Sequence, residues 1–384
     1  MAKHEQLLKD LIGIKSYSGE ETILKNFIAD WFEHRQIANF AQDDNLIVRL
    51  GGEDRTRAFI FNSHMDTVSS GSLPWRYGPW TAHKDGDKMI GLGASDMKGG
   101  LAASMLLAEA MAANGKPPVD MWFTYVVKEE VDGSGTESFA DWFEREGHVK
   151  RYSDMAAIST EPTGLKELEH GHRGNLFLKM TTEGGSGHAS RPHLLKTHSV
   201  RQMMKFADAL QTKFGEWSQE FSDGQFTPPT LGEITSIQAG VAIKGAGEGQ
   251  VIEVESPNKF PAVCTATFDI RTTPQFHKVA FERIKEFGRA MNVSVDYAFS
   301  AAPAGYTDPT EKIIKVTKQI VPSAELTVSD GSADLGFLTI HGIKAVIFGP
   351  GEKDQSHKTN EYCYPSQIPE AVEIYKQIVE VWAK

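Results

Sequence analysis

Short apolar runs alternate with helical patterns along the first half of the chain. Residues 23–28 have the spacing of a helix face, and Ser18 and Glu21 stand before them in the arrangement of a capping box. An alanine-rich stretch after Gly99–Gly100 predicts a further helix. The apolar runs that predict strands lie at Leu46–Leu50, Ala58–Phe61, Met121–Val127 and Met155–Ile158. Fully apolar strands that alternate with helices indicate an α/β fold, a mixed and mostly parallel sheet with helices on both faces.

The pattern changes near residue 174. Residues 176–180 alternate as in a half-buried strand, and the segments that follow predict the order β-α-β-β-α-β of a compact antiparallel α+β module. Its helices are expected at about 196–213 and 276–290, and its later strands near 230–239, 261–272 and 293–299. A helix at 313–320 and a strand at 345–348 then resume the first pattern. We therefore expect one domain at 1–174 and 302–384, with a second domain at 175–301 inserted into it.

Composition excludes several classes of protein. The chain has 384 residues and a formal net charge of −11, which argues against a nucleic-acid partner or an anionic membrane surface. Cys264 and Cys363 are the only two cysteines in the sequence, which is too few for a disulfide framework or a thiolate zinc site. This low number fits a reducing cytoplasm. The N-terminus is charged where a signal peptide has its apolar core, and no apolar stretch is long enough to cross a membrane. A cytoplasmic location is expected.

His64 follows directly on a predicted strand and precedes Asp66 by two residues. Ligands of open α/β sheets bind at the carboxyl ends of the strands. Residues two apart in an extended chain point to the same side, so Asp66 can accept the second ring N–H of His64 and fix the tautomer of a metal-binding histidine. A hydrogen-bonded turn explains this pair equally well.

Four further places repeat the theme of a strand end followed by histidine or a carboxylate. Asp96 precedes the glycine-opened helix as a cap or a ligand, Glu129 and Glu130 follow a buried strand together, and Glu161 and His357 follow two others. Any one of these acidic residues is more often a solvated loop charge. Their recurrence at five strand ends predicts a metal site.

The ligand types indicate which metal site this is. Two histidines and three carboxylates without thiolates suit two divalent ions, with zinc the first candidate and cobalt or manganese the alternatives. A shared carboxylate can bridge such a pair, and two metals would lower the pKa of a bound water and polarise a carbonyl. Neighbouring residues of an extended segment point apart, so one of Glu129 and Glu130 can bind metal while the other acts as general base.

Together these motifs resemble one enzyme family. The segments "HMDTV", "GASDMKGG", "EE", "EPTG" and "GPG…H…NE" resemble, in order and from about residue 5 to the C-terminus, the dinuclear zinc hydrolases that include acetylornithine deacetylase, succinyl-diaminopimelate desuccinylase, aminoacylase and glutamate carboxypeptidase. The resemblance implies a zinc-exopeptidase-like fold with an inserted, ferredoxin-like lid and dimerisation domain, and a cis peptide between Asp96 and Met97. It implies these roles: His64 and Glu161 at one metal, Glu130 and His357 at the other, Asp96 as the bridge, Glu129 as the base, and Asp66 behind His64.

The resemblance also implies roles for the inserted domain. In a homodimer, His188 of "GGSGHASRP" would reach the partner subunit's site and stabilise the oxyanion, and Arg271 of "FDIR" would hold a substrate carboxylate. A surface histidine in a glycine-rich turn and a solvated arginine are the alternatives. Asn258 of "SPNKFP" matches a family asparagine, although the spacing of the preceding loop is changed.

The expected substrate is a small N-acyl amino acid. The resemblance implies that a glutamate at the position of Glu161 is typical of deacylases and carboxypeptidases. The remaining alternatives for this protein are a dipeptidase or a metal-bearing binding protein without turnover. Desuccinylases of the family carry "GRRG" where this chain has "GHRG". A neutral His172 cannot replace a guanidinium against a succinyl carboxylate, which favours an uncharged acyl group, as in an acetylornithine deacetylase. Residues 226–240 and the segment "SDGSAD" instead resemble the desuccinylases, which are the alternative activity. Arg173 and Ser332 complete the candidate substrate-binding residues.

Overall fold

The computed structural model describes residues 1–384 except 223, 228–230, 245–249 and 254–255. The chain divides into two compact units. The first unit comprises Met1–His172, Gly305–Ser329 and Ala333–Lys384, and the second comprises Arg173–Ala304 with Asp330–Ser332. The short segment Asp330–Ser332 groups with the second unit because Arg173 Nε donates to Asp330 Oδ1 at 2.7 Å and Ser332 Oγ donates to the Arg173 carbonyl at 2.8 Å.

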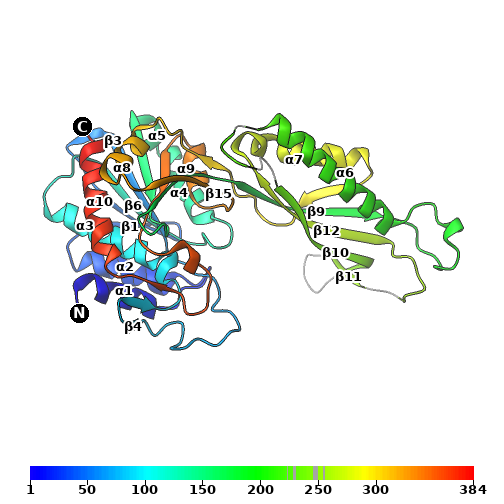
Figure 1. The fold of residues 1–384 in the computed structure, drawn as a ribbon, viewed down its shortest axis with the longest axis horizontal. Helices are drawn as coiled ribbons and strands as arrows, with labels where there is room; N and C mark the ends of the chain where they lie inside the picture. The colour runs from blue at the N-terminus through cyan, green and yellow to red at the C-terminus, as the bar shows by residue number, and fades with distance from the viewer. Residues whose placement is uncertain (223, 228–230, 245–249, 254–255) are drawn as a thin grey trace. The chain divides into compact units, whose positions relative to one another are not determined.

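A nine-stranded mixed sheet forms the centre of the first unit (Figure 1). The strand order is β1-β2-β6-β3-β7-β16-β8-β14, and β15 also pairs with β8. Strands β6, β3, β7 and β16 run parallel to one another, whereas β2 pairs antiparallel with β6 and β8 pairs antiparallel with β16. The bounds are β1 Asn39–Gln42, β2 Asn45–Leu50, β3 Asp54–His64, β6 Val119–Val126, β7 Asp154–Ser159, β8 Glu167–His172, β14 Gly305–Tyr306, β15 Glu325–Ser329 and β16 Lys344–Ile347. A small sheet joins β4 His83–Asp85, β5 Lys88–Ile90 and β17 Tyr362–Cys363.

Helices cover both faces of the large sheet, as predicted. Phe59 and Phe61 of β3 belong to one apolar cluster, whereas Ala58 and Ile60 belong to another, because alternate residues of a strand point to opposite faces. The first cluster packs α1 Lys3–Gly13, α2 Thr22–Glu33, α3 Gly99–Ala113, α8 Lys312–Ile320 and α10 Gln367–Trp382. The second packs α4 Ser134–Arg145 and α9 Leu335–Ile340, with α5 His148–Arg151 beside α4. A strand buried on both sides is therefore apolar throughout.

The capping box predicted at Ser18 and Glu21 is wrong. Helix α2 has Glu21 as its N-cap residue, without a side-chain cap. The Ser18 hydroxyl instead donates to Asp66 Oδ2 at 2.6 Å, and Glu21 Oε1 accepts the backbone N–H groups of Gly19 and Lys128. Both side chains thus join loops to one another, a long-range use that local spacing does not reveal.

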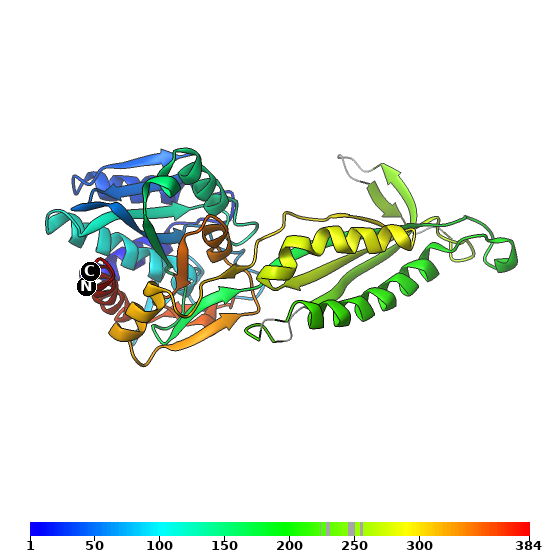
Figure 2. The same cartoon turned by 90° about the horizontal axis from the view of Figure 1, so that it is seen from above.

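The second unit is a five-stranded antiparallel sheet with two long helices on one face (Figure 2). Its strands lie in the order β11-β10-β12-β9-β13, and omission of β11 leaves the ferredoxin-like arrangement expected from the β-α-β-β-α-β pattern. The short strand β11, which extends β10 as a hairpin, was not expected. The bounds are β9 Gly174–Glu183, α6 Ser199–Glu220, β10 Leu231–Lys244, β11 Gln250–Glu253, β12 Val263–Thr272, α7 Pro274–Ala290 and β13 Ser294–Tyr297.

Three short helical turns complete the described chain: a π-type turn at Ala94–Lys98 and 3-10 turns at Pro192–Leu194 and Lys353–Gln355. Among the residues that the structure describes, none of the helices combines the length and the apolar character needed to cross a membrane.

Candidate metal centre

The parallel strands of the first unit bring the predicted ligands to one edge of the sheet. His64 is the last residue of β3, Glu129 and Glu130 follow β6, and Glu161 follows β7. His357 comes after β16, in a left-handed backbone conformation with φ +62°. Parallel neighbours end at the same edge, which is why residues far apart in sequence meet there.

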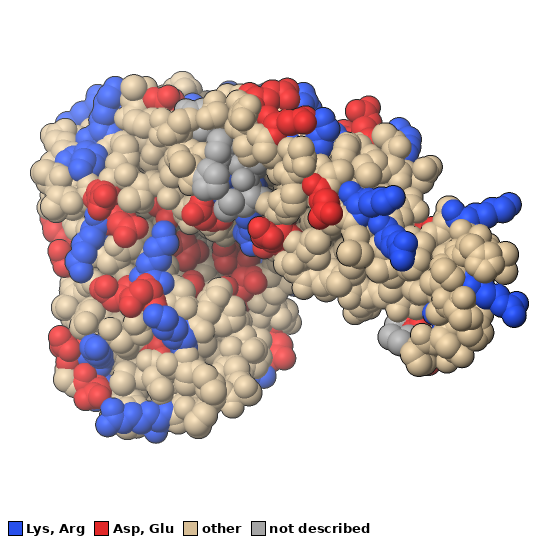
Figure 3. All heavy atoms as spheres, turned by 45° about the vertical axis from the view of Figure 1, so that its right-hand side comes forward, with Lys and Arg blue, Asp and Glu red and all other residues tan. Residues whose placement is uncertain are grey.

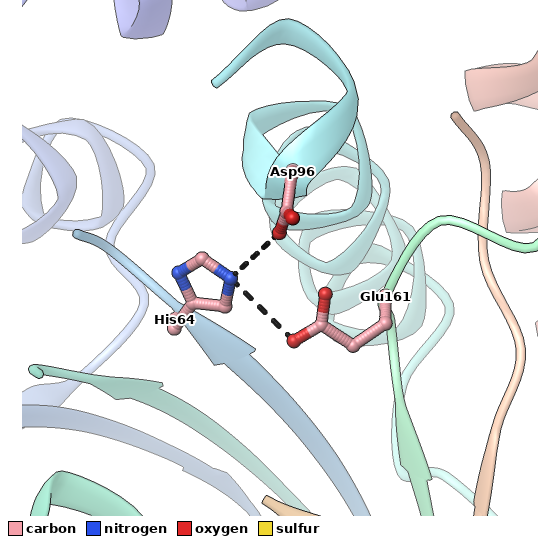
Figure 4. Close-up of side chains that lie close together, drawn as sticks. All are labelled: His64, Asp96 and Glu161. Carbon is pink, nitrogen blue, oxygen red and sulfur yellow. Dashed lines mark hydrogen bonds and ion pairs between the residues drawn. The ribbon is translucent and has the colours of Figure 1, made fainter. Parts of the chain in front are cut away.

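Two groups of potential ligands form at this edge and share Asp96. His64, Asp96 and Glu161 make up one group, and Asp96, Glu130 and His357 make up the other, with the ligand atoms of each within 4.8 Å of one another. His64 Nε2 lies 3.1 Å from Asp96 Oδ1 and 3.5 Å from Glu161 Oε1 (Figure 4). His357 Nε2 lies 2.8 Å from Glu130 Oε2 and 3.6 Å from Asp96 Oδ2. The two carboxylate oxygens of Asp96 thus face different groups.

Asp66 lies beside the first group and organises the second. His64 Nδ1 lies 3.0 Å from the Asp66 carbonyl and 3.4 Å from its carboxylate, so Asp66 favours the tautomer that leaves Nε2 for a ligand. The Asp66 carboxylate also accepts the backbone N–H groups of Glu129 and Glu130, both at 3.1 Å. One buried side chain therefore orients the histidine and the adjacent glutamate pair.

Asp96 stands in the π-type turn that leads into α3, and it does not cap the helix, whose N-cap residue is Lys98. The peptide bond between Asp96 and Met97 is cis, as the family resemblance implied. The carboxylate of Glu361 accepts three backbone N–H groups of this turn. Sequence reasoning assigned no role to Glu361, although it is the last residue of the "GPG…H…NE" motif.

Crowding shifts the pKa values of these groups. Burial, followed by the charge of Glu161, raises the pKa of Glu129 well above its usual range. Burial raises the pKa of Glu161 to about 8, and that of Glu130 also rises through burial and the nearby Asp96. The hydrogen bond to Glu130 raises the pKa of His357 to about 9. A divalent cation between these groups would have the opposite effect, because it stabilises ionised carboxylates and neutral imidazoles.

A second buried carboxyl group, missed by sequence reasoning, lies near Glu129. Asp334 is buried and accepts hydrogen bonds from Asn62 Nδ2 at 2.9 Å and from Thr136 Oγ1 at 2.6 Å. Burial raises its pKa to about 6. Its charge contributes to the raised pKa of Glu129. Asp334 is the last residue of the segment "SDGSAD", in which sequence reasoning assigned a role to Ser332 alone.

The site has the donor set and the unsatisfied atoms that a pair of divalent cations requires. Oε1 of Glu130 and Oε1 of Glu161 are buried and have no hydrogen-bond partner among the described residues. A buried carboxylate oxygen without a partner is costly unless a cation binds it. Acidic side chains lie within a hollow on the face of the first unit seen in Figure 3. Imidazole nitrogens and carboxylate oxygens suit zinc, cobalt or manganese.

Two neighbouring candidates for substrate binding lie at the end of β8 and just after it. His172 is fully buried, and its Nε2 accepts the Gly336 N–H at 3.0 Å, so the ring takes part in internal packing of the first unit. This position argues against the acyl-group selectivity that the sequence suggested for His172. The side chain of Arg173, in the second unit, is also buried and bound to Asp330.

Arg271 of the second unit is paired with a carboxylate on its own strand. Its Nη2 donates to Asp269 Oδ2 at 3.0 Å, its Nε forms an ion pair with Asp269 Oδ1 at 2.8 Å, and its Nη1 lies 3.5 Å from Ser332 Oγ. The hydrogen bond and the ion pair to Asp269 together restrict the orientation of the guanidinium. The side chain is partly buried and paired with Asp269, and its binding of a substrate carboxylate stays a prediction.

His188 and Asn258 lie on adjacent loops of the second unit, and both are exposed. The Asn258 carbonyl accepts the Ala189 N–H at 2.7 Å, and His188 forms an antiparallel bridge with Lys259. His188 Nδ1 pairs with the Ser190 hydroxyl at 2.8 Å. The structure thus brings together two residues that are 70 positions apart in the chain.

Comparisons with known proteins find relatives of the chain over almost its whole length. The chain is 25% identical over 390 residues to the succinyl-diaminopimelate desuccinylase of Pseudoalteromonas atlantica, with 97% of each chain covered. It is 26% identical over 391 residues to that of Nautilia profundicola, with 98% of each covered. Among solved structures, an M20 family metallo-carboxypeptidase from Sulfolobus solfataricus matches with a TM-score of 0.74 at 16% identity, with 100% of both chains covered.

The Bacillus subtilis YXEP protein, described as a dinuclear metal binding peptidase from the M20 family, matches with a TM-score of 0.70 at 13% identity and covers 99% of this chain and 97% of its own. Residues 60–381 match the profile of peptidase family M20/M25/M40. The chain therefore belongs to this family of metal-dependent hydrolases and acts on amide bonds.

Proposed function

We propose that the protein hydrolyses the amide bond of an N-acyl amino acid at a dinuclear metal centre. The observation that carries this proposal is the position of Asp96 between two ligand groups, with Glu129 adjacent to the site but outside both groups. His64 and Glu161 would hold one ion, Glu130 and His357 the other, and Asp96 would bind both. Two divalent ions there would supply Lewis acidity toward the amide carbonyl and toward water.

Glu129 is the proposed general base. It takes a proton from the attacking water and returns this proton to the leaving amine nitrogen, so a single carboxylate serves both halves of the reaction. Two features support this role. Asp66 fixes the backbone of Glu129 through the 3.1 Å hydrogen bond, and the Glu129 carboxylate belongs to neither ligand group, which leaves it available for proton transfer.

We place a succinyl group ahead of an acetyl group as the acyl substituent. The relatives matched over almost their whole length are succinyl-diaminopimelate desuccinylases. One argument for acetyl was the neutral His172, whose ring is buried and bonded to Gly336. The segment 226–240 favoured the succinyl alternative from the sequence, although residues 228–230 lie outside the described part of the chain.

Three further assignments belong to the same proposal. Zinc is the proposed native ion, because the ligands combine imidazole with carboxylate. The second unit would mediate a twofold dimer in which the exposed His188 completes the partner's site. Both cysteines are buried and unpaired, which supports a reducing, cytoplasmic setting.

The test is a substrate panel with the purified protein loaded with zinc or cobalt. We expect kcat/KM for N-succinyl-diaminopimelate to exceed that for N-acetylornithine by more than about tenfold, the factor that corresponds to about 1.4 kcal/mol of transition-state binding. The reverse ratio would restore the acetyl assignment. Turnover that stops on chelation would exclude a binding protein without activity, and failure to hydrolyse any acyl amino acid or dipeptide would contradict the proposal.

A further inference from the structure

The turn that presents Asp96 is held by one buried carboxylate, that of Glu361. Glu361 Oε1 accepts the N–H groups of Ser95 at 2.7 Å and of Asp96 at 2.9 Å, and Oε2 accepts the Gly93 N–H at 2.8 Å. The residue is only 1% exposed. Three hydrogen bonds to one buried side chain, two on Oε1 and one on Oε2, fix this backbone in one position.

Further contacts join the same turn to the same C-terminal segment. The Gly91 N–H donates to the Glu361 carbonyl at 2.9 Å. The Ser95 hydroxyl donates to the Glu352 carbonyl at 3.1 Å and accepts the Glu352 N–H at 2.6 Å. The segment 352–361 also carries His357. The bridging ligand and a ligand of the second group are therefore parts of one hydrogen-bonded assembly.

Glu361 itself is in neither ligand group. Its two carboxylate oxygens are occupied by backbone N–H groups, whereas the candidate ligands Glu130 and Glu161 each retain a buried oxygen without a hydrogen-bond partner among the described residues. This difference separates a residue that would bind metal from one that positions a ligand.

We propose that Glu361 is the positioning residue of the bridging carboxylate. It holds Asp96 where both of its oxygens can be used at once, and it couples the binding of the two ions by tying Asp96 to the segment of His357. This inference rests on the proposed bridging role of Asp96, but it is independent of which amide is hydrolysed.

The test compares Co²⁺ binding by the wild type, Glu361→Gln and Glu361→Ala in the full chain, by calorimetry and by the visible absorption of bound Co²⁺. Glu361→Gln keeps one oxygen for Ser95 and Asp96 but turns an NH₂ group toward the Gly93 N–H. We expect both binding steps to weaken by about 10–100-fold, the usual effect of losing a partner that orients a metal ligand. The Co²⁺ spectrum should change, and Glu361→Ala should weaken binding further.

Two matched variants serve as controls. Asp120→Asn removes a different buried carboxylate, at the start of β6 and away from the ligand-bearing strand ends, and should leave Co²⁺ affinity unchanged. Glu161→Gln removes a ligand of one group only and should weaken mainly one binding step. Wild-type affinity and spectrum in a folded Glu361→Gln would overturn the inference, as would an equal loss in Asp120→Asn. A wild type that binds no Co²⁺ would overturn the metal centre as well.

Discussion

Glu129 and Glu130 are neighbours in sequence with different surroundings. Glu130 Oε2 lies 2.8 Å from His357 Nε2, within a ligand group, whereas Glu129 belongs to neither group. We therefore expect Glu129→Gln to keep both ions and its fold but to lose about 10²–10⁴-fold in kcat, the usual contribution of a general base. Steady-state kinetics with measured metal content checks this.

Glu137→Gln, an exposed change in α4, is the matched control and should retain full activity. A Glu129→Gln enzyme with more than about a tenth of the wild-type rate would contradict the assignment of the base.

His64, Glu130 and Glu161 could be predicted because they lie at the ends of apolar strands, whereas Asp96 lies in the turn before α3 and His357 follows β16 by ten residues. Glu361 and Asp334 could not be assigned in this way. Their roles depend on hydrogen bonds to residues that are more than 190 positions away in the chain, such as Asp96 and Thr136. His172 shows a different limit, because a changed residue within a motif suggested a substrate contact, whereas the structure shows its ring bonded to Gly336, and its role in substrate binding stays a prediction.

At the scale of elements, the approach of α3 to β7 fixes the distance between two ligands. A Cβ atom on Gly100, near the start of α3, would lie 1.9 Å from the Thr160 carbonyl oxygen, next to Glu161. Gly100→Ala should therefore push the helix away, lower the free energy of unfolding by about 1–3 kcal/mol and weaken metal binding. Thermal unfolding and Co²⁺ calorimetry measure both effects.

Gly13→Ala is the matched glycine control, because nothing lies within 4 Å of its added Cβ in α1. We expect this variant to be neutral or slightly stabilised. If Gly100→Ala behaves in the same way, the close packing of α3 against β7 does not position the site.

Helix α7 contains a pH-dependent contact. Burial lowers the pKa of His277 to about 4, and Thr272 Oγ1 lies 2.7 Å from its Nδ1. A histidine whose folded-state pKa is lowered stabilises the fold fully above its unfolded pKa of about 6.5, and this stability is lost as the pH falls toward 4. The second unit should therefore lose about 2–3 kcal/mol of stability through His277 between pH 7.5 and 4.5.

Amide hydrogen exchange of α7 in the full chain measures this loss. His277→Gln should reduce the difference between the two pH values by that amount, since glutamine does not titrate. An unchanged pH dependence in the variant would contradict this account, because it would mean that His277 has the same pKa in the folded and unfolded states.

Strong periodicity made the main elements predictable, and weak signals explain the exceptions. The apolar strands β2, β6 and β7 and the helices α6 and α7 were found because each has a long, regular pattern. Strand β11 has only four residues, and its pairing with β10 depends on a hairpin rather than on its own composition. Ser18 and Glu21 failed as a capping box because both side chains bond to other loops.

At the scale of the whole molecule, the change of pattern near residue 174 revealed an inserted module, but no pattern in one chain reveals what a second copy contributes. If His188 completes the partner's site, two inactive proteins should restore each other. Mixing His188→Ala with Glu129→Gln should yield heterodimers with one competent site, and about a quarter of the wild-type activity at equal mixing.

His193→Ala, another exposed histidine five residues away, should be active without mixing. Absence of rescue after verified subunit exchange would mean that His188 does not act across the dimer.

The central claim is that one carboxylate joins two metal ions in this site, and metal content tests it most directly. Wild-type protein loaded with zinc should contain two ions per chain by mass spectrometry. Asp96→Ala should lose both or nearly both while remaining folded, because Asp96 faces both ligand groups. A folded Asp96→Ala protein that retains two ions per chain would contradict the account.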